Sequence, residues 1–181
     1  MQWETNLASH INSILGHYKV IDWLIIFFAG YFSYLLLIGV LYLWYREKSL
    51  KIRLESIFLV LISLMLSRGI FTEVIRFFYN RPRPFMVLEN AYVLIPHASS
   101  PSFPSGHAAF FFALGFSLLY FNRRIGVIYL TSALFISIAR VLANLHWISD
   151  ILGGIFIALV SVFMIRHLLY LSWHKNLALS K

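Results

Sequence analysis

The feature that most restricts the fold of this chain is a long stretch, residues 23–45, without a single charged side chain. Asp22 and Arg46 flank this stretch, and Trp23, Trp44 and Tyr45 lie at its two ends. A helix of about 20 apolar residues crosses the hydrocarbon core of a bilayer, and Trp and Tyr gather where that core meets water. The stretch therefore predicts a transmembrane helix.

Four further apolar runs follow, at about residues 54–79, 104–121, 125–143 and 150–170. The chain of 181 residues is 60% hydrophobic and only 12% charged, whereas a soluble domain has about 25% charged residues. We therefore expect an all-α integral membrane protein, a single domain over residues 1–181 built as a bundle of about five transmembrane helices. Apolar residues recur at helical spacing within residues 2–18, which predicts a short amphipathic helix at the membrane interface.

The positions of the lysines and arginines predict how the chain is oriented, because cytoplasmic loops are enriched in both. With five spans the two termini lie on opposite sides, and placing loop 46–53 inside puts most basic residues there. The N-terminus is then outside and the C-terminus inside. The net charge of +8 is explained by this bias and does not indicate nucleic-acid binding. The basic residues expected inside are Arg46, Lys48, Lys51, Arg53, Arg123, Arg124, Arg166, Lys175 and Lys181.

The second half of the second span carries the charged residues Arg68, Glu73 and Arg76. Charges at membrane depth are costly and usually face the protein interior or a water-filled cavity. Glu73 and Arg76 are three apart and are expected to pair. Arg68 lies about 140° around an ideal helix from Glu73, so we expect no direct pair between them. A purely structural role for Arg68 and Glu73 is the alternative to a functional one.

Pro101–His107 predicts a helix start after a long polar loop. Backbone N–H groups in a first helical turn are unpaired and lie at the positive end of the helix dipole, which makes such a turn an anion site in principle. His107 adds a group that can transfer a proton near neutral pH. An ordinary helix start is the alternative interpretation.

Several polar residues from three separate segments are predicted to lie at the same outer face. Guanidinium groups suit phosphate oxygens, and of two histidines one can attack phosphorus while the other protonates the leaving oxygen. His146 and Asp150 are four apart, so on a helix the carboxylate would hold one ring nitrogen. Metal ligation is the rival, but the flanking arginines would repel a divalent cation, and we expect no metal. The group comprises Arg76, Arg81, Arg83, His107, Arg140, His146 and Asp150.

Three motifs now resemble, in order and spacing, the signature of the type 2 phosphatidic acid phosphatase superfamily. They are Arg76-x6-Arg83-Pro84, Pro104-Ser105-Gly106-His107 and Arg140-x5-His146-x3-Asp150. The family motifs read Lys-x6-Arg-Pro, Pro-Ser-Gly-His and Ser-Arg-x5-His-x3-Asp. This chain departs from them by Arg76 in place of Lys and Ala139 in place of Ser, and neither change removes a nucleophilic or proton-transferring group.

The resemblance implies roles for these residues and no cofactor. His146 would be the nucleophile that forms a phosphohistidine, and Asp150 would orient it. His107 would be the general acid and later activate the hydrolytic water. Arg81 fits no motif position, and we expect it either to meet a second phosphate or to lie at the headgroup level, with the latter favoured. The residues implied to bind phosphate are Arg76, Arg83, Ser105, Gly106 and Arg140.

Within the superfamily the chain most resembles the small bacterial undecaprenyl-diphosphate phosphatases linked to bacitracin resistance. The likeness lies in the short N-terminal helix and in residues 83–85, 94–98, 102–105 and 122–126. It implies a multi-pass protein of the bacterial plasma membrane that removes the terminal phosphate of undecaprenyl diphosphate at the outer face, recycling the carrier lipid for peptidoglycan synthesis. Phosphatidylglycerophosphate or phosphatidate are alternative substrates among membrane lipids. A lipid or anion transporter is an alternative of another class, and the oligomeric state stays open.

Overall fold

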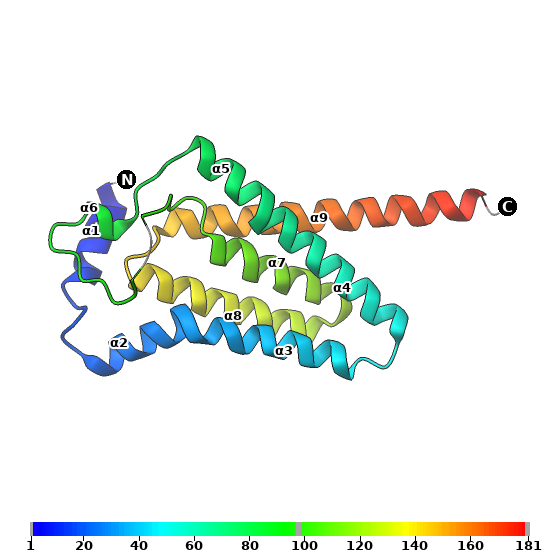
Figure 1. The fold of residues 1–181 in the computed structure, drawn as a ribbon, viewed down its shortest axis with the longest axis horizontal. Helices are drawn as coiled ribbons and strands as arrows, with labels where there is room; N and C mark the ends of the chain where they lie inside the picture. The colour runs from blue at the N-terminus through cyan, green and yellow to red at the C-terminus, as the bar shows by residue number, and fades with distance from the viewer. Residues whose placement is uncertain (1, 97–98, 180–181) are drawn as a thin grey trace.

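The computed structural model describes the backbone of residues 2–96 and 99–179 and the side chains through residue 169, so His97 and Ala98 of the 94–98 motif lie outside the described residues. Within these ranges all regular secondary structure is helical (Figure 1). The elements are α1 (Gln2–Asn12), α2 (Lys19–Ile26), η1 (Phe27–Tyr31), α3 (Phe32–Arg46), α4 (Leu50–Leu64), η2 (Met65–Phe71), α5 (Thr72–Phe78), α6 (Pro84–Val87), α7 (Gly106–Phe121), α8 (Arg123–Leu142) and α9 (Ile148–Leu179).

Four helical stretches are long and apolar enough to cross a membrane, Lys19–Arg46, Leu50–Phe78, Arg123–Leu142 and Ile148–Leu169. The first two each contain a π-helical segment, η1 and η2, in which the backbone turn is wider. The prediction of an all-α membrane bundle is thus confirmed. The remaining predicted span corresponds to α7, which has 16 residues. At a rise of about 1.5 Å per residue, α7 is shorter than the roughly 30 Å hydrocarbon core.

The short helix α7 lies in the centre of the bundle and packs against α4, α8 and α9 (Figure 1). Its residues are apolar on all sides, which is typical of a buried helix. Glycines allow close approach of its neighbours: a Cβ at Gly115 would lie 2.7 Å from Leu130, and one at Gly154 would lie 2.7 Å from the carbonyl oxygen of Ser105. Protein surrounds α7, so its length need not match the bilayer.

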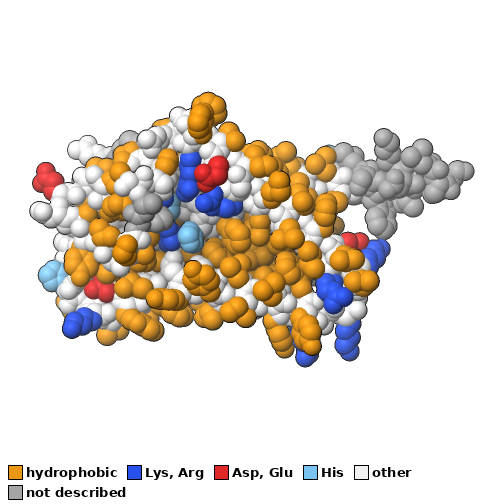
Figure 2. All heavy atoms as spheres, viewed as in Figure 1, with side chains coloured by type: hydrophobic (Ala, Val, Ile, Leu, Met, Phe, Trp, Pro, Cys, Tyr) orange, Lys and Arg blue, Asp and Glu red, His pale blue; other side chains and the backbone are white. Residues whose placement is uncertain are grey.

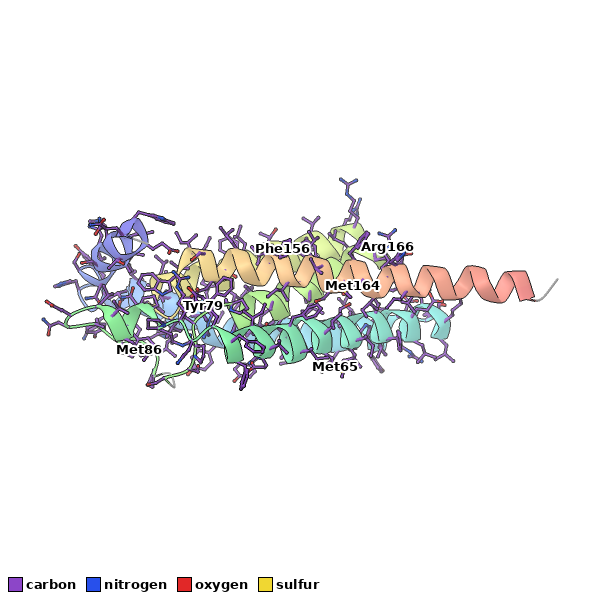
Figure 3. All side chains as sticks on the ribbon, turned by 90° about the horizontal axis from the view of Figure 1, so that it is seen from above. Met65, Tyr79, Met86, Phe156, Met164 and Arg166 are labelled. Atoms are coloured by element: carbon purple, nitrogen blue, oxygen red, sulfur yellow. The ribbon has the colours of Figure 1, made fainter. Side chains whose placement is uncertain are left out.

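One end of the bundle gathers the end of α5, the starts of α7 and α9, and the helices α1 and α6 (Figure 1). The predicted N-terminal helix is present as α1, and Glu4 and Ala8 on it are buried. At the opposite end α9 extends beyond the bundle in both ribbon views (Figures 1 and 3). This helix was predicted to end near Tyr170 but continues to Leu179.

The flank of the bundle is covered by exposed hydrophobic side chains, and Lys and Arg side chains lie at the end away from α1 (Figure 2). Examples from the exposed apolar set are Tyr34, Leu35, Ile38, Leu61, Leu134 and Phe156. Such an apolar surface is suited to contact with the lipid tails of a bilayer. A group of charged side chains also lies within the apolar flank, towards the α1 end (Figure 2).

Candidate active site

The start of α7 has a capped helix terminus. Ser105 is the N-cap, and its Oγ accepts a hydrogen bond from the Ala108 N–H at 3.4 Å. Gly106 and His107 are the first two helical residues, so the helix begins two residues later than predicted from Pro104. The Ser105 N–H donates to the backbone oxygen of Asp150 at 2.9 Å, which joins the start of α7 to the start of α9.

His146 and Asp150 face each other with His146 Nδ1 3.4 Å from Asp150 Oδ2. His146 lies in the connection between the last two predicted spans, in the turn before α9, and of the two residues only Asp150 is helical. The pairing survives because the Trp147 N–H also donates to Asp150 Oδ2, at 2.9 Å, and folds the turn onto the carboxylate. His146 is 2% exposed and Asp150 0%. Since Nδ1 is directed at Asp150, Nε2 is the ring nitrogen left for chemistry.

Arg83 lies against His146 Nε2, with its Nη1 at 3.2 Å. It also donates to the carbonyl oxygens of Leu145 at 2.8 Å and Ser100 at 2.9 Å, so it ties the loop before α7 to the turn before α9. Burial, and next the charge of the neighbouring Arg76, lower the pKa of Arg83 to about 10. Arg83 therefore keeps its positive charge at neutral pH.

Arg76 and Arg140 complete the group of guanidiniums. Arg76 donates to the carbonyl oxygen of Pro104 from Nη2 at 3.0 Å and from Nε at 3.3 Å. Arg140 donates from Nη1 to the carbonyl oxygen of Ala29 at 3.2 Å, and the same nitrogen lies 3.3 Å from His107 Nε2. Arg140 Nε is buried and has no hydrogen-bond partner among the described residues. The structure thus brings all eight residues of the sequence-derived site to one end of the bundle.

Arg81 has partners that neither of the two expectations for it named. The expectation of a headgroup-level position is wrong, because Arg81 is only 7% exposed. Its Nη1 donates to Asp150 Oδ1 at 2.6 Å and to Ser149 Oγ at 2.6 Å, and its Nη2 donates to Glu4 Oε2 at 2.9 Å. A buried carboxylate needs such a partner. In the segment Arg81-Pro82-Arg83, Arg81 therefore contacts Asp150 and Arg83 contacts His146.

Glu4 extends this network to α1. Its Oε1 accepts hydrogen bonds from the Ser149 N–H at 3.0 Å and Ser149 Oγ at 2.8 Å. Burial alone would raise the pKa of Glu4, but the hydrogen bonds from Ser149 and the charge of Arg81 outweigh it and lower the pKa. No local pattern in the sequence pairs Glu4 with residues so far along the chain. The N-terminal helix is consequently fastened by an ionic contact to the end of the bundle that carries the candidate site.

The prediction for Arg68 is also wrong: its Nη1 pairs directly with Glu73 Oε1. The expected pair of Glu73 with Arg76 is present as well, at 3.5 Å. The error came from assuming an ideal α-helix. Residues 65–71 form the π-helical η2, in which each turn closes on the fifth residue and brings Arg68 and Glu73 to the same side.

Chemically, the arrangement is an anion site with two imidazoles. Among the described residues, no group of three or more His, Asp or Glu side chains is placed to hold a metal ion. Arginine forks and a helix N-terminus both favour phosphate.

Comparison with known proteins shows the family to which the chain belongs. A model of the PAP2 superfamily matches residues 56–174. The bacitracin transport permease protein BcrC of Bacillus licheniformis is 27% identical over 155 residues, covering 86% of this chain and 75% of that protein. The undecaprenyl-diphosphatase BcrC of Bacillus subtilis (strain 168) is 28% identical over 156 residues, covering 85% and 78%.

Two solved structures share the fold. The crystal structure of Aquifex aeolicus LpxE superposes with a TM-score of 0.70 at 25% identity, covering 88% of this chain and 92% of that one. A PAP2-type phosphatidylglycerolphosphate phosphatase from Bacillus subtilis superposes with a TM-score of 0.64 at 18% identity, covering 92% and 84%. The second likeness concerns the fold alone. With the family match over most of its helices, this chain belongs to the PAP2 superfamily and is a membrane lipid phosphate hydrolase.

Proposed function

We propose that the chain removes the terminal phosphate of undecaprenyl diphosphate through a phosphohistidine on His146. The observation that carries this proposal is the buried His146–Asp150 pair, which leaves Nε2 beside Arg83. The substrate is suggested by the name of the Bacillus subtilis relative, undecaprenyl-diphosphatase. The product, undecaprenyl phosphate, is the carrier lipid of peptidoglycan synthesis.

In the first step, Nε2 of His146 attacks the terminal phosphorus, and the bond from that phosphorus to the bridging oxygen breaks. Asp150 stabilises the positive charge that develops on the imidazole by accepting the Nδ1–H. His107 donates a proton to the departing bridging oxygen, and undecaprenyl phosphate leaves. His107 is suited to this role because it stands in the first turn of α7, within reach of an anion bound there.

In the second step, water attacks the phosphohistidine while His107, now neutral, takes a proton from that water. The bond between phosphorus and Nε2 breaks, inorganic phosphate forms, and His146 returns to its starting state. No bound metal is needed for either step, because guanidiniums and backbone N–H groups supply the charge stabilisation.

Arg76, Arg83 and Arg140 are proposed to bind the phosphate oxygens, with Ser105 and Gly106 at the helix terminus. The buried Nε of Arg140 supports this role, since a phosphate oxygen would supply the partner it lacks among the described residues. Arg76 replaces the family lysine with a fork that already spans the Pro104 carbonyl by two nitrogens. Ala139 in place of the family serine removes one hydroxyl donor.

The substrate assignment predicts the outcome of a phosphate-release panel. Purified protein in detergent is offered undecaprenyl diphosphate, phosphatidylglycerophosphate and phosphatidate, each with and without EDTA. We expect kcat/KM for undecaprenyl diphosphate to exceed the other two by at least about tenfold, a transition-state difference of about 1.4 kcal/mol, with no loss in EDTA. A higher kcat/KM for phosphatidylglycerophosphate would identify that lipid as the substrate. A lasting loss of phosphate release in EDTA would contradict the metal-free mechanism.

The active site is proposed to face the outside of the cell, with the N-terminus outside. This orientation is supported by the basic residues at the end of the bundle away from the site (Figure 2). The chain has no cysteine, so single cysteines can be introduced and labelled. In intact cells an impermeant maleimide should label the Glu89→Cys variant and spare Lys48→Cys until the cells are lysed. Both positions are exposed, so the opposite pattern would invert the topology.

A further inference from the structure

An exposed ion pair lies inside a membrane span, next to the proposed phosphate site. Arg68 and Glu73 belong to the span Leu50–Phe78, and their side chains are 39% and 51% exposed. Figure 2 shows charged side chains grouped within the apolar flank. Charge at membrane depth is costly, so a pair that is not sheltered by the protein requires an explanation beyond packing.

Arg68 touches the first residue of α7. A Cβ on Gly106 would lie 2.6 Å from Arg68 Nε and 3.1 Å from its Cδ, so only glycine lets this side chain lie so close. Ser67, its neighbour, donates from Oγ to the backbone oxygen of Ala109 at 3.3 Å and fastens η2 to the first turns of α7. Arg68 therefore borders the helix terminus where the proposed function places the reacting phosphate.

The π-helical turn that brings Arg68 there has a side-chain support. A wide turn changes the backbone hydrogen-bond ladder, and Thr72 Oγ1 donates to the carbonyl oxygen of Ser67 at 2.8 Å. Ser67 and Thr72 are both fully buried. Single π-helical turns occur frequently at functional sites.

The carboxylate of Glu73 lies between two guanidiniums. Its Oε1 pairs with Arg68 Nη1 and also lies 3.5 Å from Arg76 Nη1. Arg76 in turn belongs to the proposed phosphate-binding group. Like a phosphate oxygen, the Oε1 atom of this carboxylate is an anionic acceptor that meets guanidinium donors from two arginines. The position that Glu73 fills is thus an anion position, adjacent to the first one.

We propose that Arg68 binds the second, chain-bearing phosphate of a lipid diphosphate, and that Glu73 fills this position until the substrate displaces it. The proposal rests on the proposed function, which places the terminal phosphate at the start of α7. The diphosphate then extends from His146 towards the apolar flank, where its lipid chain meets the bilayer. A lipid monophosphate has no second phosphate to offer Arg68, so this residue separates the two substrate classes.

The test compares Arg68→Gln with Glu73→Gln on undecaprenyl diphosphate and on phosphatidate. For Arg68→Gln we expect the KM of the diphosphate to rise about tenfold or more and kcat/KM for phosphatidate to stay within about twofold. For Glu73→Gln we expect the KM of the diphosphate to fall, because the competing carboxylate is gone. Removing the two ends of one ion pair should therefore have opposite effects.

Arg53→Gln and Glu55→Gln are the matched controls, since both lie on α4 at the far end of the same span. If Arg68→Gln changes kcat/KM for both substrates by the same factor, or changes it for neither, the proposal is overturned, and the Arg68–Glu73 ion pair is structural. Thermal unfolding of each variant is measured in parallel, and Arg68→Lys, which retains the charge, should restore part of the diphosphate affinity. Wild-type protein that hydrolyses neither lipid would instead overturn the proposed function, which is a distinct result.

Discussion

The His146→Ala variant is expected to lose phosphate release by a factor of at least about 10³, because no other group in the mechanism can form the covalent intermediate. The loss should appear in kcat for every lipid substrate that the wild type accepts. Rapid quenching of the wild type during turnover should trap an acid-labile, alkali-stable phosphoenzyme, and the variant should show none. Both measurements use detergent-purified protein.

The fold should tolerate this change, which makes the result interpretable. Without His146, the carboxylate of Asp150 keeps its bonds from Arg81 and from the Trp147 N–H. His167→Ala is the matched control, because His167 lies on α9 outside the site and stacks on Phe163. A His146→Ala variant with more than about a tenth of wild-type turnover would exclude His146 as the nucleophile.

Replacing Arg81 with methionine is expected to destabilise the protein by about 3–5 kcal/mol and to inactivate it. The variant leaves two buried carboxylates, Glu4 and Asp150, without the guanidinium that both contact. Asp150 would keep the bond from the Trp147 N–H but lose the one that fixes Oδ1, so its alignment with His146 should weaken and the loss of activity should exceed what reduced folding explains. Thermal unfolding in detergent and the specific activity of the folded fraction measure the two effects separately.

Further variants distinguish positioning from general stability. Arg81→Lys keeps the charge but cannot reach both carboxylates with a fork, so an intermediate result is expected. Adding Glu4→Gln to Arg81→Met should restore part of the stability, because one of the unpaired charges is removed. Arg123→Met, at the exposed start of α8, should resemble the wild type. An Arg81→Met variant as stable as the wild type would contradict a buried ionic contact.

The Glu4 contact also predicts a pH dependence. The pKa of Glu4 is lowered on folding, so its charge contributes stability above the ordinary glutamate value of 4.5 and loses that contribution as pH falls further. Acidification below about that value should therefore destabilise the wild type more than Glu4→Gln. Equal losses in the two proteins would contradict this.

The membrane bundle was predictable because its signals are local. An uncharged run such as residues 23–45 has few outcomes other than a membrane span. The boundaries of the predicted spans were close to those observed, apart from the extension of α9 to Leu179. The central position of α7 was not predictable, since apolar runs that face lipid and apolar runs that face protein have the same composition.

The eight residues of the candidate site could be proposed from the sequence because spacing in three short motifs is also local, and the structure brings them to one end of the bundle. Backbone geometry that departs from an ideal α-helix could not be predicted from the sequence. The prediction for Arg68 assumed 3.6 residues per turn, whereas η2 has a wider turn, across which Thr72 donates a hydrogen bond to the carbonyl oxygen of Ser67. The spacing of His146 and Asp150 would place them on one face of a helix, yet His146 meets Asp150 from a turn whose Trp147 N–H donates to the same carboxylate.

By itself, the sequence determined that the chain is a helical membrane protein and which histidines, arginines and aspartate are the candidates for its site, because hydropathy and motif spacing are properties of neighbouring residues. Only the tertiary structure decided that Arg81 holds Asp150, that Glu4 on α1 holds Arg81, and that Arg68 reaches the start of α7. The physical reason is that a buried charge must be neutralised by whatever opposite charge the packed helices bring to it. That partner is chosen by helix packing, and it can lie anywhere along the chain.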